Sequence, residues 1–409
     1  MTTHRGIVKA LWRAAGDSES VVLATVVRVS GSSYGGVGAR MVVRVDGTTV
    51  GVVSGGCLET DLAERARSAH AAGRAVVVTY DTRADDDAAW GLGLGCNGLI
   101  DVLLEPLRPV DAAAFARLLE QGLAADARCV LATVISAEAP NPGAIGDISR
   151  INAVAANTSM DNVAAAVELP DVGAHALFEG ETIETTGNWG DRSLLKLALA
   201  DVNTAIEAGR RGAVCDYGKA AIAFETVTPA IRLIVCGSGP DTLPLARLAS
   251  ELGWDLTIVD HRPVEHAQLE RFPDALVVEC ADPSRLAEAV VLTPRCGAVV
   301  MSHHFERDLE YVHALLGSTA GYIGVLGPRA RTEHMLSELA LRYGAPTGAD
   351  ARLFGPVGLD IGGDGPEAIA LSIVGEVASV LNQRGAGHLK NRRAPLHEDT
   401  SPARVSDDG

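Results

Sequence analysis

The sequence is poor in aromatic residues, in long apolar runs and in paired cysteines. Aromatic residues make up only 4% of the 409 residues, so the 47% hydrophobic content consists mainly of alanine, valine and leucine, enough for packed cores. No apolar run approaches the roughly 20 residues of a membrane span, and residues 1–15 contain no signal-peptide core. The seven cysteines lack CxxC and Cys/His spacing, which indicates reduced thiols and argues against a structural metal. We therefore expect a cytoplasmic protein with no membrane partner.

Positive charge is also scarce. The chain has 35 lysines and arginines against 52 aspartates and glutamates, a formal net charge of −17. This balance argues against nucleic acid as a partner, although a local site could still hold a small anion. The length predicts two domains, or three small ones.

The most distinctive stretch is residues 50–59. A β-branched strand leads through Ser-Gly-Gly, which includes Gly55 and Gly56, into Cys57 and a segment with helical apolar spacing. The free N–H groups and the dipole at a helix N-terminus stabilise a thiolate and favour an anionic group beside it. A second cysteine, Cys96, lies in a glycine-rich loop over residues 91–98. The alternative is that both are buried thiols in tight turns.

The first half contains a divergent repeat. The sequence Val-Leu-Ala-Thr-Val at residues 22–26 returns at residues 130–134, and Ala-Gly-Arg precedes a strand that reaches Tyr80 in one place and Tyr217 in the other. We predict that residues 20–107 and 127–228 are two copies of one α+β unit within a domain of residues 1–228. The second copy lacks both cysteine sites, which favours a functional role for them. The stretch after residue 137 is polar and irregular and predicts no particular element.

From residue 229 onward, continuous apolar strands alternate with helices, which predicts a Rossmann-like, doubly wound parallel sheet over residues 229–384. Gly237-Ser238-Gly239 follows the first strand and Asp260 ends the second, as in dinucleotide-binding folds. Asp260 suits a ribose diol, whereas Arg262 suits a phosphate. Pro240 and Thr242 depart from that pattern, because Thr242 stands at the position of its third glycine.

His303 is a further candidate, because Ser302-His303-His304 ends the fourth strand of this sheet. Ligands of open α/β sheets collect at the carboxyl ends of strands, so His303 is a candidate for ligand contact or proton transfer. The alternative is a helix-capping turn with solvent-facing histidines. Residues 385–409 are polar without periodicity, which predicts a disordered tail.

Motifs in both halves resemble the XdhC/CoxI family of accessory factors for xanthine dehydrogenase and related molybdenum hydroxylases. The matching motifs are Gly31-Ser-Ser33, Gly38-Ala-Arg-Met41, Ser54-Gly-Gly-Cys-Leu-Glu59, Gly95-Cys96, Asp101-Val-Leu-Leu-Glu105, Ser302-His303, Tyr322-Ile-Gly324 with Gly327, Pro356-Val-Gly-Leu-Asp-Ile-Gly362 and Ile369-Ala-Leu-Ser-Ile373. The chain departs from the family at residues 34–37, where basic residues and a proline are usual, and at Pro240, where many members have histidine.

The resemblance implies a cytoplasmic chaperone that binds the molybdenum–pterin cofactor, shields it during sulfuration and passes it to an apo molybdenum hydroxylase. Cys57 would be a molybdenum ligand or persulfide carrier, and Cys96 its partner. Arg40 and the amides of Gly55 and Gly56 would hold the anionic group. A cysteine desulfurase would be a partner, and a homodimer is possible.

In the second half, the resemblance implies a site for a nucleotide moiety of the cofactor, or for NAD(P) or FAD. One alternative is an oxidoreductase that binds its cofactor through Gly237, Gly239 and Asp260 and uses His303 as acid/base. Another is a cofactor-free scaffold for the desulfurase and the target enzyme. We expect a chaperone rather than a turnover enzyme.

Overall fold

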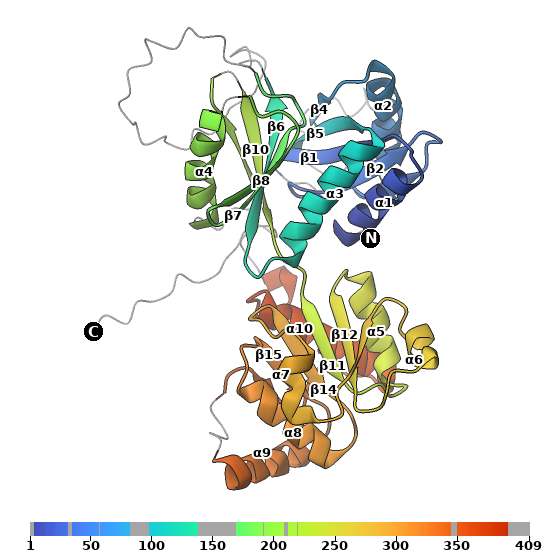
Figure 1. Ribbon diagram of the computed structural model, residues 1–409, viewed down its shortest axis with the longest axis vertical. Helices are drawn as coiled ribbons and strands as arrows, with labels where there is room; N and C mark the ends of the chain where they lie inside the picture. Colours follow the sequence, from blue (N-terminus) through green and yellow to red (C-terminus); the bar gives the residue numbers. More distant parts are fainter. Residues whose placement is uncertain are drawn as a thin grey trace, which may run out of the picture. The chain divides into compact units, whose positions relative to one another are not determined.

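The computed structural model describes residues 4–31, 35–56, 58–81, 98–137, 169–190, 192–207, 212–218, 220–344 and 350–391. The chain divides into two compact units, which meet between Pro229 and Ala230 in the sequence (Figure 1). Cys57, Cys96 and residues 392–409 of the predicted tail lie outside the described residues.

The first repeat forms an antiparallel five-stranded sheet with the order β3-β2-β1-β5-β4. Its alternating apolar residues pack on one face against α2, in a cluster that includes Leu62 and Tyr80. The elements are α1 (His4–Gly16), β1 (Val21–Gly31), β2 (Arg40–Arg44), β3 (Thr49–Gly51), α2 (Glu59–Ala72), β4 (Val76–Asp81), β5 (Gly98–Leu107) and α3 (Pro109–Ala124).

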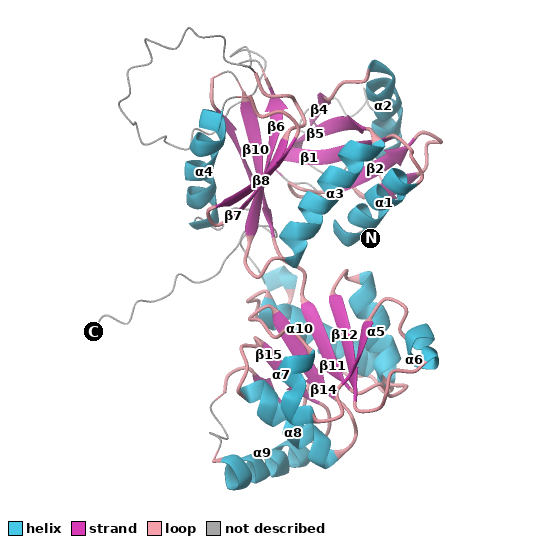
Figure 2. Cartoon of the chain, viewed as in Figure 1, coloured by secondary structure: helices cyan, strands magenta, loops and turns pink. Residues whose placement is uncertain are grey.

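The second repeat forms a sheet of the same order, β8-β7-β6-β10-β9, with α4 on one face (Figure 2). Equivalent hydrogen bonds recur: Tyr80 donates to Asp61 and Tyr217 donates to Asp201, each at 2.5 Å. The prediction of two divergent copies is therefore confirmed. The elements are β6 (Cys129–Ser136), β7 (His175–Glu179), β8 (Thr182–Thr186), α4 (Arg192–Glu207), β9 (Gly212–Asp216) and β10 (Ala221–Val227).

Helices α1 and α3 fill the space between the two sheets. Ile7 and Leu11 of α1 and Phe115 of α3 are at most 1% exposed and share a core cluster with Leu23 of the first sheet and Leu131 of the second. The two repeats are therefore halves of one packed unit.

The second unit contains a six-stranded sheet in which every pairing is parallel, with the order β13-β12-β11-β14-β15-β16. Helices α5 and α10 cover one face, and α7, α8 and α9 cover the other. This arrangement confirms the doubly wound, Rossmann-like prediction. The helices are α5 (Thr242–Glu251), α6 (His266–Arg271), α7 (Leu286–Ala289), α8 (Phe305–Leu316), α9 (Arg329–Tyr343) and α10 (Pro366–Leu381). The strands are β11 (Arg232–Cys236), β12 (Asp255–Asp260), β13 (Leu276–Glu279), β14 (Cys296–Val300), β15 (Tyr322–Val325) and β16 (Leu353–Phe354).

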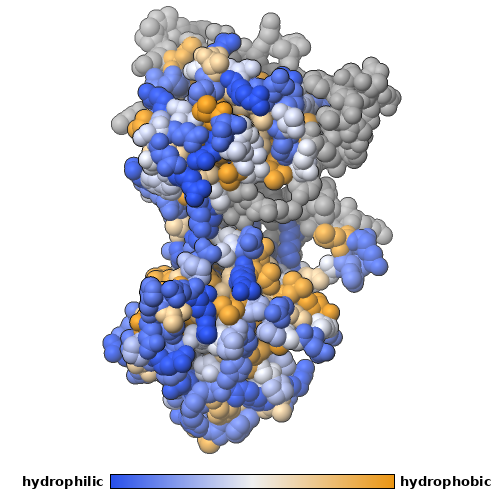
Figure 3. Space-filling view, turned by 90° about the vertical axis from the view of Figure 1, so that its right-hand side faces the viewer, coloured by the Kyte–Doolittle hydropathy of each residue, from blue (hydrophilic) through white to orange (hydrophobic). Residues whose placement is uncertain are grey.

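The surface is mostly polar where Figure 3 colours it, with apolar residues in small patches. Among the helices that the structure describes, none has the length and apolar character needed to cross a bilayer. The described residues also contain no cluster of histidine, cysteine, aspartate and glutamate that could hold a metal ion.

Candidate functional site

The glycine-rich turn after β11 brings the chain close to the end of β14. Gly237 has φ +139°, and a Cβ there would lie 2.5 Å from the Met301 carbonyl oxygen, so only glycine fits. Thr242 replaces the third glycine of the dinucleotide-binding pattern without opening a gap. Its side chain is fully buried, and Oγ1 donates to the Gly237 carbonyl at 3.2 Å.

Asp260, at the end of β12, is 3% exposed and already receives several hydrogen bonds. Arg262 donates from its backbone N at 2.9 Å and from Nη2 at 2.8 Å, Gln268 Nε2 donates at 3.1 Å, and Ser238 Oγ also donates. Burial opposes ionisation of Asp260, but the hydrogen bonds from Arg262 and Ser238 outweigh it and hold the pKa well below its usual range. A ribose diol would have to displace some of these donors.

Positive charge gathers beside Asp260. The Arg262 side chain is 61% exposed, and its Nη2 also donates to Ser238 Oγ at 3.0 Å. Arg271 Nη1 donates to the Ser238 carbonyl at 3.1 Å. The pKa of His261 is lowered, first by burial and then by the charge of Arg307. This edge of the sheet therefore presents cations to solvent, which favours an anionic ligand group.

His303 is paired with Asp241, a residue that no sequence motif indicates as part of the site. His303 Nε2 lies 2.8 Å from Asp241 Oδ2, and the His303 side chain is 60% exposed. The backbone of His303 has φ +61°, a left-handed conformation that is uncommon outside glycine and recurs at functional sites. Asp241 precedes α5, so its carboxylate stands at the N-terminal end of that helix.

The turn that presents His303 is held by Ser302 and Asp308. Ser302 donates to Asp308 Oδ1 from its backbone N at 3.1 Å and from Oγ at 2.6 Å, and Arg331 binds Asp308 Oδ2 at 2.6 Å. Ser302 Oγ also accepts a hydrogen bond at 3.3 Å from the backbone N of His304, the exposed residue that precedes α8, so the capping turn and the ligand-contact role of His303 both stay predictions. Ser302 thus fixes the turn, and the His303 side chain contacts Asp241.

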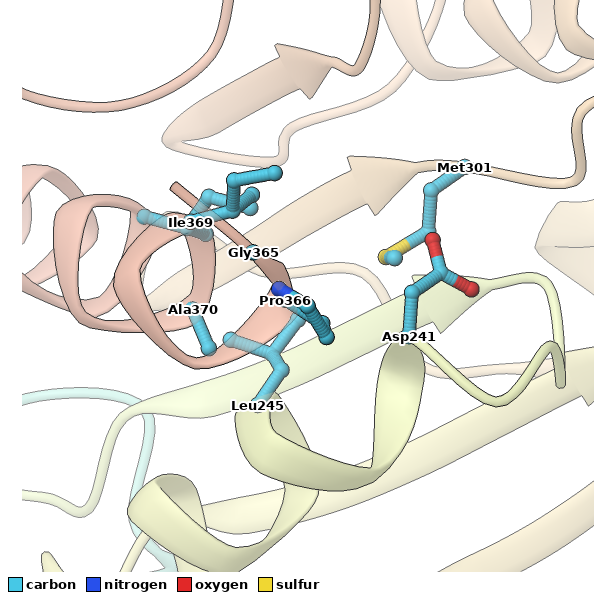
Figure 4. A pocket seen from close by; sticks show the side chains of 8 residues that line it. Asp241, Leu245, Met301, Gly365, Pro366, Ile369 and Ala370 are labelled. Atoms are coloured by element: carbon cyan, nitrogen blue, oxygen red, sulfur yellow. The ribbon is translucent and has the colours of Figure 1, made fainter. Parts of the chain in front are cut away.

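A pocket of about 190 Å³ lies beside this pair. In Figure 4, the Asp241 carboxylate points from the start of α5 toward Met301, and Pro366, Ile369 and Ala370 of α10 line the other side. The remaining lining residues are Leu245, Gly365 and Ile373.

In the first unit, the turn before position 57 holds a carboxylate of its own. Glu59 accepts hydrogen bonds from the backbone N of Val53 at 3.0 Å, of Ser54 at 2.8 Å and of Gly56 at 2.8 Å, and from Ser54 Oγ at 2.7 Å. Gly55 and Gly56 have φ +78° and +114°. Burial opposes ionisation, but these bonds lower the pKa of Glu59. The Gly56 amide expected to hold the cofactor's anionic group therefore binds Glu59 here.

Arg40 lies in the interior of the first unit. It is 4% exposed and forms an ion pair with Glu225 of the second repeat, and its Nη1 donates to the Gly38 carbonyl at 3.0 Å. Its guanidinium carbon lies 5.5 Å from the centre of the Phe115 ring. The structure thus gives Arg40 a bridging role between repeats, and its role in cofactor binding stays a prediction.

Four of the described cysteines, Cys129, Cys236, Cys280 and Cys296, are buried, which makes them poor thiolates. Burial raises the pKa of Cys129 to about 11 and of Cys296 to about 12. The proposed thiol chemistry would therefore fall to Cys57 and Cys96, whose roles stay predictions.

The fold and these sites define a two-unit protein in which a duplicated α+β unit precedes a Rossmann-type unit with a small, mostly apolar pocket. Residues 233–377 match the XdhC Rossmann domain, and residues 12–81 match the XdhC and CoxI family. The chain belongs to the XdhC and CoxI family.

Similarity to individual proteins covers both units. The chain is 30% identical over 365 residues to a probable xanthine dehydrogenase subunit of Bacillus subtilis, covering 88% of this chain and 93% of that protein. It is 35% identical over 106 residues to the molybdenum cofactor insertion chaperone PaoD of Escherichia coli, 26% of this chain and 32% of PaoD. A crystal structure described as a xanthine dehydrogenase from Bacillus halodurans aligns with a TM-score of 0.68 at 29% identity, covering 96% of this chain and 99% of that one.

Proposed function

We propose that the chain is a maturation factor for a xanthine dehydrogenase-type molybdenum hydroxylase. It binds the molybdenum–pterin cofactor, assists its sulfuration and transfers it to the apo-hydroxylase. The observation that carries the proposal is family membership over both units, together with 35% identity to an insertion chaperone over 106 residues. A cysteine desulfurase supplies the sulfur, and a homodimer is a possible assembly.

The cofactor is the cargo of this protein, and the chain's residues fit its handling. Cys57 follows a turn whose amides at Val53, Ser54 and Gly56 are held in place by Glu59. A thiolate at such a helix start is a suitable soft ligand or persulfide carrier. Cys96 acts as its partner. In the second unit, the edge formed by Arg262 and Arg271 is suited to a phosphate of a nucleotide.

The oxidoreductase alternative is weaker. The pyrophosphate of a bound dinucleotide normally lies at the N-terminus of the helix after the first strand. Here Asp241 directly precedes that helix, and its negative charge opposes a pyrophosphate at the helix N-terminus.

The test is the ligand content of protein purified under reducing conditions from a molybdenum-replete host. Pterin fluorescence after oxidation, molybdenum by elemental analysis and released nucleotide by chromatography are measured for the wild type, Cys57→Ser and Cys96→Ser. Cys280→Ser is the control, because burial raises the pKa of that thiol. We expect pterin and molybdenum in the wild type and control, and loss in Cys57→Ser. Bound NAD(P) or FAD without pterin would favour the oxidoreductase, and no ligand would favour the scaffold.

A further inference from the structure

The pocket beside Asp241 lies where the sheet of the second unit reverses its strand order. β11 pairs with β12 on one side and with β14 on the other. Helix α5, which follows β11, and helix α8, which follows β14, contribute to core clusters on opposite faces of the sheet. Ligands of open α/β sheets bind at the carboxyl ends of the strands at such a point. The pocket includes Asp241, which follows β11, and Met301, which follows β14.

The pocket has the size and lining for a planar ring. Its volume is about 190 Å³, and an apolar cavity of about 150 Å³ accepts benzene. Leu245, Ala370 and Ile373 are 1% exposed and form apolar walls, whereas Ile369 is 42% exposed, so the pocket borders solvent. The volume is therefore of the order that a planar ring requires, and the pocket opens to solvent beside Ile369.

Asp241 is the one polar side chain among the described residues that line the pocket. A carboxylate has about four acceptor positions, and His303 Nε2 uses one of them at Oδ2. The Asp241 side chain accepts no other hydrogen bond within the part of the chain that the structure describes. Figure 4 shows this carboxylate directed along the apolar wall toward Met301. An acceptor beside apolar walls favours a ligand that brings hydrogen-bond donors.

The geometry points to a neutral ring rather than a phosphate at this position. The Asp241 carboxylate repels an anion. A carboxylate can, however, accept two parallel N–H hydrogen bonds, as carboxylates do from the guanidinium group of arginine. The 2-amino-4-oxopyrimidine edge of pterins and of guanine presents such a pair, a ring N–H beside an amino group. We propose that Asp241 and this pocket form a subsite for a ring with that edge. The inference deepens the proposed function. It rests on that function in one respect, because a pterin is taken as one source of the ring.

The test uses matched ligands on the full chain purified without bound cofactor. 6-Hydroxymethylpterin is compared with the corresponding lumazine, in which an oxygen replaces the 2-amino group. Guanosine is compared with inosine, which lacks the amino group. We expect the amino-bearing member of at least one pair to bind about tenfold more tightly or better. Preference in the pterin pair identifies a pterin as the source, and preference in the guanosine pair identifies a guanine nucleotide.

Two variants test the pocket itself. Asp241→Asn keeps the shape of the side chain but replaces one acceptor oxygen with an amino group. This group cannot accept hydrogen bonds from the ligand's donors, so affinity should fall about tenfold or more. Ile369→Trp narrows the pocket at its exposed side and should also abolish binding. Glu251→Gln, at an exposed position of the same helix, should bind as the wild type does. Equal affinity within both ligand pairs, unchanged binding by Asp241→Asn, or no binding of any probe at millimolar concentration would overturn the proposal.

Molybdenum retention, measured on the same preparations, separates this inference from the proposed function. Wild-type protein that retains cofactor, together with an Asp241→Asn variant that binds pterin unchanged, would overturn the subsite and leave the function standing. Wild-type protein that retains no cofactor but binds the pterin through Asp241 would support the subsite and count against the function.

Discussion

Glu225 in β10 of the second repeat forms a buried ion pair with Arg40 in β2 of the first repeat. A reciprocal contact runs in the opposite direction, in which Oε1 of Glu105 in the first repeat lies 2.9 Å from Nε2 of His175 in the second. The positions are equivalent in the two sheets. The cross-strand partner of Glu105 is Leu23, and that of Glu225 is Leu131. In the same way, Arg40 is paired with Thr25 and His175 with Thr133.

Removal of one partner of the Arg40–Glu225 pair should be costly. Glu225→Gln leaves the Arg40 charge buried without its counter-charge, so the free energy of unfolding should fall by about 3–5 kcal/mol. Chemical denaturation of the full chain measures the change. Arg44→Gln, which breaks a half-exposed pair with Glu19, should cost about 1 kcal/mol or less. Equal effects of the two variants would contradict a special role for the buried pair.

The contribution of Asp260 to the stability of the second unit should decrease as the pH falls. Its folded-state pKa is lowered, so its contribution is fully present above the unfolded value of about 3.9 and is lost as the pH falls below that value. Asp260→Asn should therefore destabilise the protein at pH 7. The difference from the wild type should shrink in acid. Thermal unfolding of both proteins between pH 7 and pH 3 checks this, and a constant difference would refute it.

The cations beside Asp260 should select phosphorylated ribose. We expect 2′,5′-ADP to bind about tenfold more tightly than 5′-AMP, because Arg262 is exposed while Asp260 is occupied by other donors. Arg262→Gln should remove the preference, and Arg329→Gln, at the exposed start of α9, should keep it. Calorimetric titration measures both ligands, and tighter binding of 5′-AMP would show that Asp260 accepts the diol.

The turn before Cys57 should depend on the charge of Glu59. Glu59→Gln replaces one acceptor oxygen with a donor group, so the hydrogen bonds to that oxygen are lost, at a cost of about 1–3 kcal/mol. We expect lower retention of the molybdenum–pterin cofactor as well, since Cys57 follows this turn. Glu64→Gln, at an exposed position of α2, is the matched control. Full cofactor retention by Glu59→Gln would separate the turn from cargo binding.

Local patterns predicted the parts of the fold that depend on neighbouring residues. Gly237 and Asp260 identified the ends of β11 and β12, and the recurrence of residues 22–26 at residues 130–134 identified the repeat. Helix α3 and the β7–β8 hairpin were not identified. Because α3 is buried along much of its length, its apolar residues do not form a clear amphipathic stripe.

The missed site residues depend on contacts between distant parts of the chain. Asp241 and His303 are 62 residues apart, and their contact requires the left-handed backbone of a non-glycine residue. The family resemblance implies that Arg40 holds the anionic group of the cofactor. Its partner Glu225 lies 185 residues away and has no local signal. Glu59 belonged to a recognised motif, but only the fold brings its carboxylate to the preceding amides.

The exchange of carboxylates between the repeats also bears on how the first unit arose. A single ancestral repeat with a glutamate and a cation at these positions would have had both groups facing an uncovered surface. Two identical copies, related by a twofold axis, would have satisfied both at once. The reciprocal pairs are what the fusion of such a homodimer into one polypeptide would leave behind. A chain divided between α3 and β6 should accordingly yield two halves that associate with each other.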